Sequence, residues 1–401
     1  MGDIVLGLGG TVDFEIEWDA AVFQHLIDEH RIRDDELSTT PPSATVAIES
    51  ERALVLTILA FLATGSGGER FVESSAVVEA FAGRFTTAVT LGGTGVRAGI
   101  ALDSLGVESV QHLVSIDDNV RRLLPASTRY VSSATRDTLD PHLIVQYPAG
   151  ASLRARDLEL VAPHANRLIF ANDPPNREMA LSADLPVALS SADVFLISGF
   201  NTMTDADLLK SRLDDLVRAI ASLPGEAVVY FEDAGYYQRD LARLPRERLL
   251  SRIDVYSMNE DELQEYLGRP VDLLNPVEVA DALRAAHALI PAPALVVHTR
   301  YWAIAVGPEA ARYRDCLESA VRMAATRYRL GDGHTAADFE FTAGLPRHAA
   351  GALVVQHVED ALPAVGVPAH DLDVANPTTI GLGDTFVGGF LAPIARERNR
   401  A

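Results

Sequence analysis

Residues 194–199, Val-Phe-Leu-Ile-Ser-Gly, begin a regular alternation of apolar strands and helix-forming segments that decides the fold of this 401-residue chain. Three apolar stretches of the same kind follow, at residues 227–233 (AVVYFED), 253–259 (IDVYSMN) and 294–299 (ALVVHT). The segments between the strands have helical patterns, over residues 205–223, 238–250, 261–267 and 277–289. Buried strands that alternate with helices predict an α/β fold, in which a parallel sheet with right-handed crossovers carries helices on both faces.

Polar or small residues follow each of these strands at its carboxyl end. They are Ser198, Gly199 and Asn201, then Glu232 and Asp233, then Asn259 and Glu262, and finally His298, Thr299 and Arg300. In open α/β sheets, ligands bind beyond the carboxyl ends of the strands. A single polar residue at a strand end is usually a cap or a turn residue, whereas the same choice at successive strands favours a binding site.

Two glycine-rich junctions lie upstream. Residues 3–10 (DIVLGLGG) have the pattern of a buried strand that ends in glycines, and residues 11–16 alternate as a half-exposed strand does. Asp13 lies just past these glycines, where its carboxylate either binds substrate hydroxyls or belongs to a turn. A strand over residues 85–91 runs into residues 92–100 (GGTGVRAGI). The glycines of this second junction either approach a ligand or allow the next helix to pack closely on the sheet.

Residues 376–391 (NPTTIGLGDTFVGGFL) are expected to form a glycine-rich turn that runs into a helix. Gly381 and Gly383 have no Cβ, so the backbone can approach a ligand closely. The unpaired N–H groups and the dipole at the start of a helix favour an anion there. A carboxylate beside an anion site, here Asp384, is suited to take a proton from a hydroxyl that attacks a phosphoryl group. The alternative is an ordinary turn in which Asp384 caps the helix.

Composition excludes several classes of protein. The chain has a net charge of −22 and a pI of about 4.8, whereas nucleic-acid binding needs a basic surface. Its longest apolar run, residues 53–64, is too short to span a membrane. The first residues lack the basic region of a signal peptide, so we expect a cytoplasmic protein. Cys316 is the only cysteine, which excludes a disulfide or a cysteine zinc site within one chain.

The basic residues restrict how a phosphate could be held. Of the 34 lysines and arginines only Lys210 is a lysine, and the P-loop pattern G-x-x-x-x-G-K-[ST] does not occur. Any bound phosphate must therefore be held by arginine, by backbone N–H groups or by a metal ion. The turn before Asp384 gains importance as an anion site for this reason.

Four of these motifs, in this order, resemble the ribokinase superfamily. They are Gly92-Gly93 before the first long helix, Asn259-Glu260-Asp261-Glu262 (N-x-x-E), the strand end His298-Thr299, and Gly381-Leu382-Gly383-Asp384 (G-x-G-D). Within that superfamily the chain is most similar to the ADP-dependent glucokinase/phosphofructokinase family, over nearly its whole length. Residues 165–170 (ANRLIF), Asp173 and Arg177 are also similar to that family.

The chain departs from the family at three positions. Tyr230 replaces the histidine of the family's H-x-E triplet, although Glu232 is retained. The run at residues 92–99 (GGTGVRAG) departs from the family's usual G-G-[NQ]-A-G and is closer to the G-G-x-G-x-N of ATP-dependent sugar kinases, with Arg97 where those have an asparagine. Ala149 stands where the family's phosphofructokinases have a lysine. Arg97 or Arg167 could supply the charge of that lysine, so the sequence leaves the acceptor open.

The resemblance implies a large Rossmann-like domain and a smaller, strand-rich lid that closes over the substrate and excludes water. The large, nucleotide-binding domain would comprise residues 1–11, 44–64, 91–125 and 173–401. The discontinuous lid would comprise residues 12–43, 65–90 and 126–172. These lid segments coincide with the irregular, strand-rich parts of the sequence pattern.

The resemblance also implies roles for individual residues. Asp384 would act as the base, the N–H groups of Gly381 and Gly383 would hold the transferred phosphoryl group, and Arg177 would contact the donor phosphates. The expected substrate-binding residues are Asp13, Glu69, Gly93, Arg97 and Asn166. The expected nucleotide-binding residues are Asn259, His298, Thr299 and Gly381. Glu232 and Glu262 would hold Mg²⁺, directly or through water, unless Glu262 forms a capping box with Asn259.

Together these inferences predict a Mg²⁺-dependent kinase that transfers a phosphoryl group from ADP, giving AMP, to a hydroxyl of a sugar or a similar small molecule. An ATP-dependent ribokinase-like sugar or nucleoside kinase would use the same chemistry with another donor. A non-catalytic ligand-binding protein on a kinase fold is the third alternative, which Tyr230 and Ala149 favour and Asp384 opposes. The expected partners are a nucleotide and a small-molecule substrate, and neither nucleic acid nor a membrane is expected to bind. We expect the protein to be a monomer or a small homo-oligomer.

Overall fold

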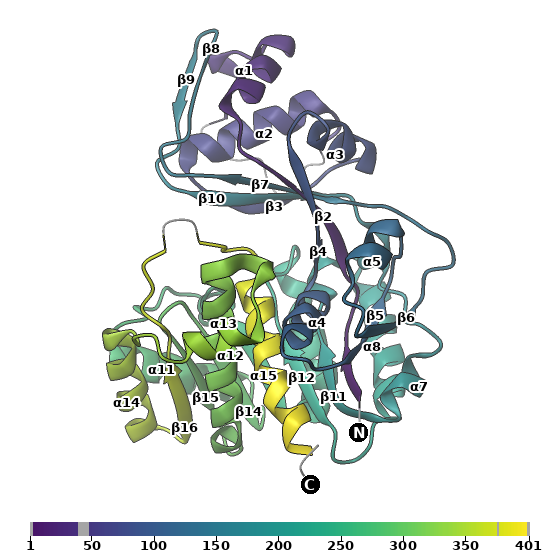
Figure 1. Ribbon diagram of the computed structural model, residues 1–401, viewed down its shortest axis with the longest axis vertical. Coiled ribbons are helices and arrows are strands. Elements are labelled where there is room, and N and C mark those ends of the chain that lie inside the picture. Colours follow the sequence, from purple (N-terminus) through teal and green to yellow (C-terminus); the bar gives the residue numbers. More distant parts are fainter. Residues whose placement is uncertain (1–2, 39–47, 375–376, 399–401) are drawn as a thin grey trace.

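A nine-stranded sheet forms the larger part of the protein (Figure 1). The computed structural model describes residues 3–38, 48–374 and 377–398. The strands of this sheet, in spatial order, are β16 (Ala364–Pro368), β15 (Trp302–Val306), β14 (Ala294–His298), β13 (Val255–Asn259), β12 (Val228–Glu232), β11 (Ala192–Ile197), β1 (Asp3–Leu6), β5 (Ser109–Leu113) and β6 (Thr128–Ser132). All pairs from β14 to β6 are parallel, whereas β15 and β16 pair antiparallel at one edge. The predicted α/β class is confirmed. The antiparallel strands β15 and β16 lie after residue 300, where the sequence pattern predicted no strand.

The alternating side chains of the strands build a core on each face of the large sheet. In β11, Phe195 and Ile197 pack on one face and Val194 and Leu196 on the other, because successive strand residues point in opposite directions. The first core includes residues of α7 (Leu185–Leu189), α8 (Ala206–Ile220), α9 (Arg243–Leu249), α10 (Glu260–Leu267), α11 (Pro276–Leu289) and α14 (Ala349–Ala361). The second includes residues of α4 (Thr94–Ser104), α12 (Arg314–Leu330) and α15 (Leu382–Arg398). Helices therefore cover both faces, as predicted.

A second sheet of five strands forms a smaller unit (Figure 1). Its strands, in spatial order, are β3 (Gly68–Phe71), β10 (Asn166–Ala171), β7 (His142–Tyr147), β2 (Thr11–Ile16) and β4 (Thr87–Gly92). One face packs against α1 (Ala20–Glu29), α2 (Glu51–Thr64), α3 (Ser75–Ala82) and the hairpin β8 (Ser152–Ala155)–β9 (Leu158–Val161). The other face is directed toward the large sheet and its helices. We call residues 11–38, 48–92 and 142–171 the small unit and the other described residues the large unit.

The remaining short elements lie in the connections. They are α5 (Asp118–Leu123), α6 (Pro174–Glu178), α13 (Ala336–Thr342) and the 3₁₀ helices η1 (Asp34–Glu36), η2 (Phe200–Thr202), η3 (Arg239–Leu241), η4 (Leu250–Arg252), η5 (Ala310–Tyr313) and η6 (Gly331–Gly333). Within the described ranges, no helix has both the length and the apolar character needed to cross a membrane.

The chain passes between the two units four times, and three of these crossings meet at one point. The crossings connect β1 to β2, β4 to α4, β6 to β7, and β10 to α6. A Cβ placed on Gly93 would lie only 3.0 Å from the Cα of Gly10, and the side chain of Asn176 donates to the Gly10 carbonyl at 2.9 Å. The first, second and fourth crossings are therefore packed against one another.

Two segments lie in a different unit from the one predicted. Helix α2 packs its apolar residues into the core of the small unit, although residues 44–64 were expected in the large domain. Strand β6 extends the large sheet beyond β5, although residues 126–172 were expected in the lid. Apolar content identifies a buried element but does not specify which of two cores buries it. The predicted boundary between residues 43 and 44 lies outside the described residues, as does Asn376 at the start of the predicted turn.

Two predicted site residues lie in short elements in or next to the small sheet. Glu69 lies in strand β3, paired with Ile169 of β10. Arg177 lies in the short helix α6, which forms because Asp173 accepts a hydrogen bond from the backbone N–H of Asn176 and two prolines occupy the first helical turn.

Candidate active site

The glycine-rich turn before α15 has the backbone expected of an anion site. Gly381 has φ +61°, and the backbone N–H and the hydroxyl of Thr385 both donate to its carbonyl, at 3.0 and 2.8 Å. A Cβ on Gly381 would lie 2.4 Å from Cδ of Arg97, so only glycine fits here. The helix that follows begins at Leu382, and the first N–H groups of an α-helix have no acceptor within the helix.

Asp384 lies in the first turn of α15, half-buried. The hydroxyl of Thr94, at the start of α4, donates to Oδ1 of Asp384 at 2.8 Å. Its Oδ2 lies 3.2 Å from the position that a Cβ of Gly381 would occupy, so this oxygen is directed toward the glycine turn. Because the helix begins two residues before Asp384, this aspartate is not its N-cap. One carboxylate oxygen is thus fixed by Thr94 and the other faces the predicted anion site.

Glu232 and His298 lie beside this turn, at the carboxyl ends of β12 and β14. Nε2 of His298 lies 2.9 Å from Oε1 of Glu232, while Oε2 of Glu232 is buried without a hydrogen-bond partner among the described residues. Burial lowers the pKa of His298, but the negative charge of Glu232 outweighs this effect and raises it. The His298 ring stacks on Phe386 of α15, with centroids 4.5 Å apart. The strand-end pair is therefore in contact with the helix that carries Asp384.

Asn259 and Glu262 form the capping box that the sequence left as an alternative. The Asn259 side chain accepts from the N–H groups of Asp261 and Glu262 at 2.7 and 3.2 Å, and Oε2 of Glu262 accepts from the Asn259 N–H at 2.8 Å. Burial, reinforced by the charge of Glu232, raises the pKa of Glu262 to about 8.

The residues predicted to hold Mg²⁺ do not form a closed protein cage. In the part of the chain that the structure describes, no three His, Cys, Asp or Glu side chains converge as a metal site. The buried, unpartnered Oε2 of Glu232 nevertheless provides an oxygen donor that Mg²⁺ prefers, and the carboxyl of Glu262 would provide a second once ionised. Magnesium usually keeps several waters and binds through one or two carboxylates and substrate phosphates, so this sparse set fits the ion.

A cavity of about 650 Å³ opens beside the start of α15. Three of the residues predicted to bind nucleotide, Asn259, His298 and Thr299, line it together with Leu382 and Gly383. The Thr299 hydroxyl accepts from the N–H groups of residues 301 and 302 and donates to a carbonyl, so it shapes the turn after β14.

A larger cleft, of about 1210 Å³, lies between the open face of the small sheet and the large unit. Glu69 and Asn166, both predicted to bind substrate, line it, as does Arg167, which the sequence suggested as a replacement for the missing lysine. Glu15 and Glu17, which had no predicted role, line it too. Glu69 accepts from the Tyr237 hydroxyl at 2.8 Å, and the Asn166 side chain donates to the Gly65 carbonyl at 3.0 Å. Asp261 and Thr379 line both cavities, so the two spaces meet near the glycine turn.

Asp13, Gly93 and Arg97 lie beneath the cleft rather than on its lining. Oδ1 of Asp13 accepts from the Thr11 hydroxyl at 2.6 Å, and Oδ2 lies 3.5 Å from Nη2 of Arg97. Arg97 is 3% exposed and also pairs with Glu15, at 3.7 Å. Gly93 has φ +88° and is packed against Gly10, as described above, so its glycine is needed for close packing.

Arg177 lies apart from these groups. Its guanidinium covers the ring of Phe71 at 5.2 Å from the centroid, and it lines neither the 650 Å³ cavity nor the 1210 Å³ cleft. A contact between Arg177 and donor phosphates stays a prediction.

The site contains four residues that sequence reasoning missed: Glu15, Thr94, Arg327 and Asp332. Glu15 follows Asp13 by two residues on a strand, so the period of 2 could have placed both carboxylates on one face. Thr94 could have been found as the first helical residue after a glycine-rich turn. No sequence signal connects Asp332 or Arg327 to residues near 97 and 380.

Comparisons with known proteins agree with this arrangement. The family model of the ADP-specific phosphofructokinase/glucokinase conserved region matches residues 2–341. The chain belongs to this family. The matched region ends before Gly381. Any role of the glycine turn must therefore be argued from its geometry in this chain.

Similar proteins include an ADP-dependent glucokinase of Bos taurus, which is 30% identical over 130 residues. The match covers 30% of this chain and only 25% of the bovine protein. Among solved structures, a hypothetical ADP-dependent phosphofructokinase from Pyrococcus horikoshii OT3 superposes with a TM-score of 0.78 at 18% identity, over 99% of both chains. An ADP-dependent kinase in complex with fructose-6-phosphate and ADPβS gives a TM-score of 0.73 at 14% identity, over 100% of this chain and 95% of the other. At such identities the likeness shows that this member of the family has the fold of these ADP-dependent kinases.

Proposed function

We propose that the protein is an ADP-dependent sugar kinase, which transfers the terminal phosphoryl group of ADP to a sugar hydroxyl and releases AMP. One observation carries this proposal. Thr379, two residues before Gly381, lines both a nucleotide-sized cavity and the cleft beneath the small unit, and Gly383, the neighbour of Asp384, lines the first of these spaces. A donor in one cavity and an acceptor in the other would therefore meet at Asp384.

Asp384 would act as the base through Oδ2, since Thr94 already donates to Oδ1. The acceptor hydroxyl would give its proton to Oδ2 while its oxygen bonds to the terminal phosphorus of ADP. The bond from that phosphorus to the bridging oxygen would break, and its electron pair would leave with AMP. The N–H groups from Gly381 to Asp384 would stabilise the charge that develops on the transferred group.

Glu232 and Glu262 would hold Mg²⁺, which when bound neutralises charge on the donor phosphates. His298 would keep Glu232 in place through the contact at 2.9 Å, and its stacking on Phe386 would tie the metal-binding carboxylate to the helix of the base. The Glu262 carboxyl would lose its proton when the ion binds, because a nearby cation lowers the pKa of a carboxyl.

The charges of the cleft favour an uncharged acceptor over a sugar phosphate. Among the described residues, its charged lining comprises four carboxylates, Glu15, Glu17, Glu69 and Asp261, and a single guanidinium, Arg167. Arg97 cannot bind a substrate phosphate while it is buried among Asp13, Glu15 and Asp332. Ala149 also lines the cleft and brings no charge. Carboxylates suit hydroxyl groups as hydrogen-bond acceptors and repel a phosphate.

The test is phosphoryl transfer by the wild-type protein with ADP or ATP as donor and glucose or fructose 6-phosphate as acceptor, each with Mg²⁺. We expect AMP release that depends on glucose and ADP. Turnover with ATP in place of ADP would assign the donor to the ribokinase-like alternative. Preference for fructose 6-phosphate would refute the argument from cleft charge. Binding of nucleotide without transfer to any sugar would refute the proposal that the protein is a kinase.

A further inference from the structure

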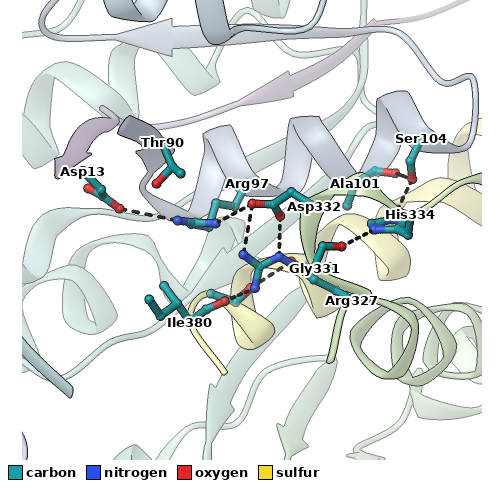
Figure 2. A network of polar contacts seen from close by, with 12 residues as sticks. Asp13, Thr90, Arg97, Ala101, Ser104, Arg327, Gly331, Asp332, His334 and Ile380 are labelled. Carbon is teal, nitrogen blue, oxygen red and sulfur yellow. Dashed lines mark hydrogen bonds and ion pairs between the residues drawn. The ribbon is translucent and has the colours of Figure 1, made fainter. Parts of the chain in front are cut away.

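We propose that Arg327 and Asp332 position the glycine turn for phosphoryl transfer and connect it, through Arg97, to the strand that carries Asp13. Arg327 and Asp332 touch neither cavity lining, and both act through other residues. The structural evidence for this inference is the geometry of one polar network (Figure 2). Its kinetic test rests on the proposed function.

Arg97 is the first part of this network. From α4 it reaches carboxylates of two units, because Nη2 lies 3.5 Å from Asp13 and 3.7 Å from Glu15, both on β2, and Nη1 lies 3.5 Å from Asp332 in η6. Burial lowers the pKa of Arg97, but these carboxylates outweigh burial and raise it. The guanidinium is therefore a fixed buried cation that several anions share.

Asp332 joins Arg97 to a second buried guanidinium. Oδ1 of Asp332 accepts from Nε of Arg327 at 2.6 Å, and Oδ2 lies 3.3 Å from Nη2 of the same residue. Burial raises the pKa of Asp332, but the hydrogen bond from Arg327 and the charge of Arg97 hold it below its usual value. Figure 2 shows the Asp332 carboxylate between the two guanidinium groups.

Arg327 ends the network on the backbone of the catalytic turn. Its Nη1 donates to the carbonyl of Ile380, the residue before Gly381, and the side chain is 3% exposed. The Ile380–Gly381 peptide is planar and trans, so its carbonyl and its N–H point in opposite directions. A carbonyl that is fixed toward Arg327 fixes the N–H of Gly381 away from it. That N–H is one of the donors proposed to hold the transferred phosphoryl group.

The network therefore orients a donor of the anion site with charges that lie outside it. A second, local contact fixes the other side of the turn, where Thr385 donates twice to the Gly381 carbonyl. The Ile380 and Gly381 carbonyls are thus both held, and the single N–H group between them, that of Gly381, points away from Arg327. A positively charged partner on the Ile380 carbonyl also polarises the peptide and strengthens its N–H as a donor.

The test compares Arg327→Lys and Asp332→Asn with the wild type. Lysine keeps the charge of Arg327 but cannot bridge Asp332 and Ile380 as a planar fork does. Asp332 is 42% exposed, so the asparagine variant is expected to fold. Arg314→Met is the matched control, since it removes an arginine–carboxylate pair (Arg314–Glu359, 2.8 Å) from the same helix α12, away from the turn. Thermal shift titrations with ADP and with AMP are measured beside kcat and KM.

A misplaced catalytic group can cost about 10²-fold in rate, so we expect kcat to fall about 10- to 100-fold in both variants with little change in KM for the sugar. ADP should bind several-fold more weakly, while AMP, which lacks the terminal phosphoryl group, should bind as in the wild type. The Arg314→Met control should match the wild type. Equal weakening of AMP and ADP, or no weakening of either, would overturn the positioning role. The titrations decide this even if the wild type transfers no phosphoryl group, an outcome that would overturn only the proposed function.

Discussion

Replacing Asp384 by asparagine removes the proposed base and leaves its surroundings in place. The amide oxygen of asparagine can still accept the hydrogen bond that Thr94 donates to Oδ1 at 2.8 Å. The atom that changes is Oδ2, which faces the glycine turn and would take the proton. The substitution therefore separates acid–base chemistry from the packing of α15 against α4.

Loss of a general base costs about 10²–10⁴ in rate, which corresponds to about 2.7–5.4 kcal/mol in the activation free energy. We expect kcat of Asp384→Asn to fall in this range, while KM for ADP and the melting temperature stay close to those of the wild type. The assay is AMP release under saturating ADP, sugar and Mg²⁺. Thr94→Val is the companion variant, since it keeps the carboxylate but frees Oδ1, and it should lose far less activity. A kcat for Asp384→Asn within tenfold of the wild type would refute the assignment of Asp384 as base.

Three further predictions concern the frame of the site. Gly381→Ala should lower the free energy of unfolding by about 1–2 kcal/mol because alanine disfavours the left-handed backbone, and by more because its Cβ would clash with Arg97. Gly106 also has a left-handed backbone, at φ +70°, but open space around it, so Gly106→Ala should show only the backbone cost when both variants are unfolded in urea. Arg97→Met should destabilise the fold by about 3–5 kcal/mol, because the buried carboxylate of Asp13 loses its cation, and an unchanged denaturation midpoint would contradict this. Burial lowers the pKa of His112 to about 4, so its protonated form is favoured only in the unfolded chain between pH 6.5 and 4. Stability should therefore fall by up to about 3 kcal/mol as pH drops through this window, and His112→Gln should lack that slope in pH-dependent melting.

The large sheet could be predicted from the sequence because its strands are short apolar runs separated by helices. The residues at their carboxyl ends were then placed by the rule that parallel strands present these ends at one edge of a sheet. His298, Glu232 and Glu262 do lie together there. Helix α2 could not be assigned to a unit in the same way, since its apolar side chains would suit either core.

The polar network could not be predicted, because it joins residues far apart in the chain through side chains of ordinary appearance. Asp332 lies in a short loop between two helices, and Arg327 lies in a helix whose other ion-paired arginines, Arg314 and Arg322, contact carboxylates of neighbouring helices. The capping box at Asn259 and Glu262 is a local feature that the sequence pattern could predict only in part. There the local pattern predicted the hydrogen bonds correctly, but the raised pKa of Glu262 comes from burial and from Glu232, which no local pattern contains.

The point where three crossings pack together determines what a movement of the small unit could change. Gly10, Gly93 and Asn176 hold the connections at that point, and Asp13 and Arg97 lie close to it along β2 and α4. Rotation about a fixed pivot displaces distant atoms most and nearby atoms least. Asp13 would therefore keep its place beside Arg97, whereas Glu69, on the strand farthest from β4 in the small sheet, would have to break its hydrogen bond with Tyr237 of the large unit in order to move. The packed crossings thus fix the innermost charges of the cleft, and the contact between Glu69 and Tyr237 at 2.8 Å ties its outer rim to the large unit.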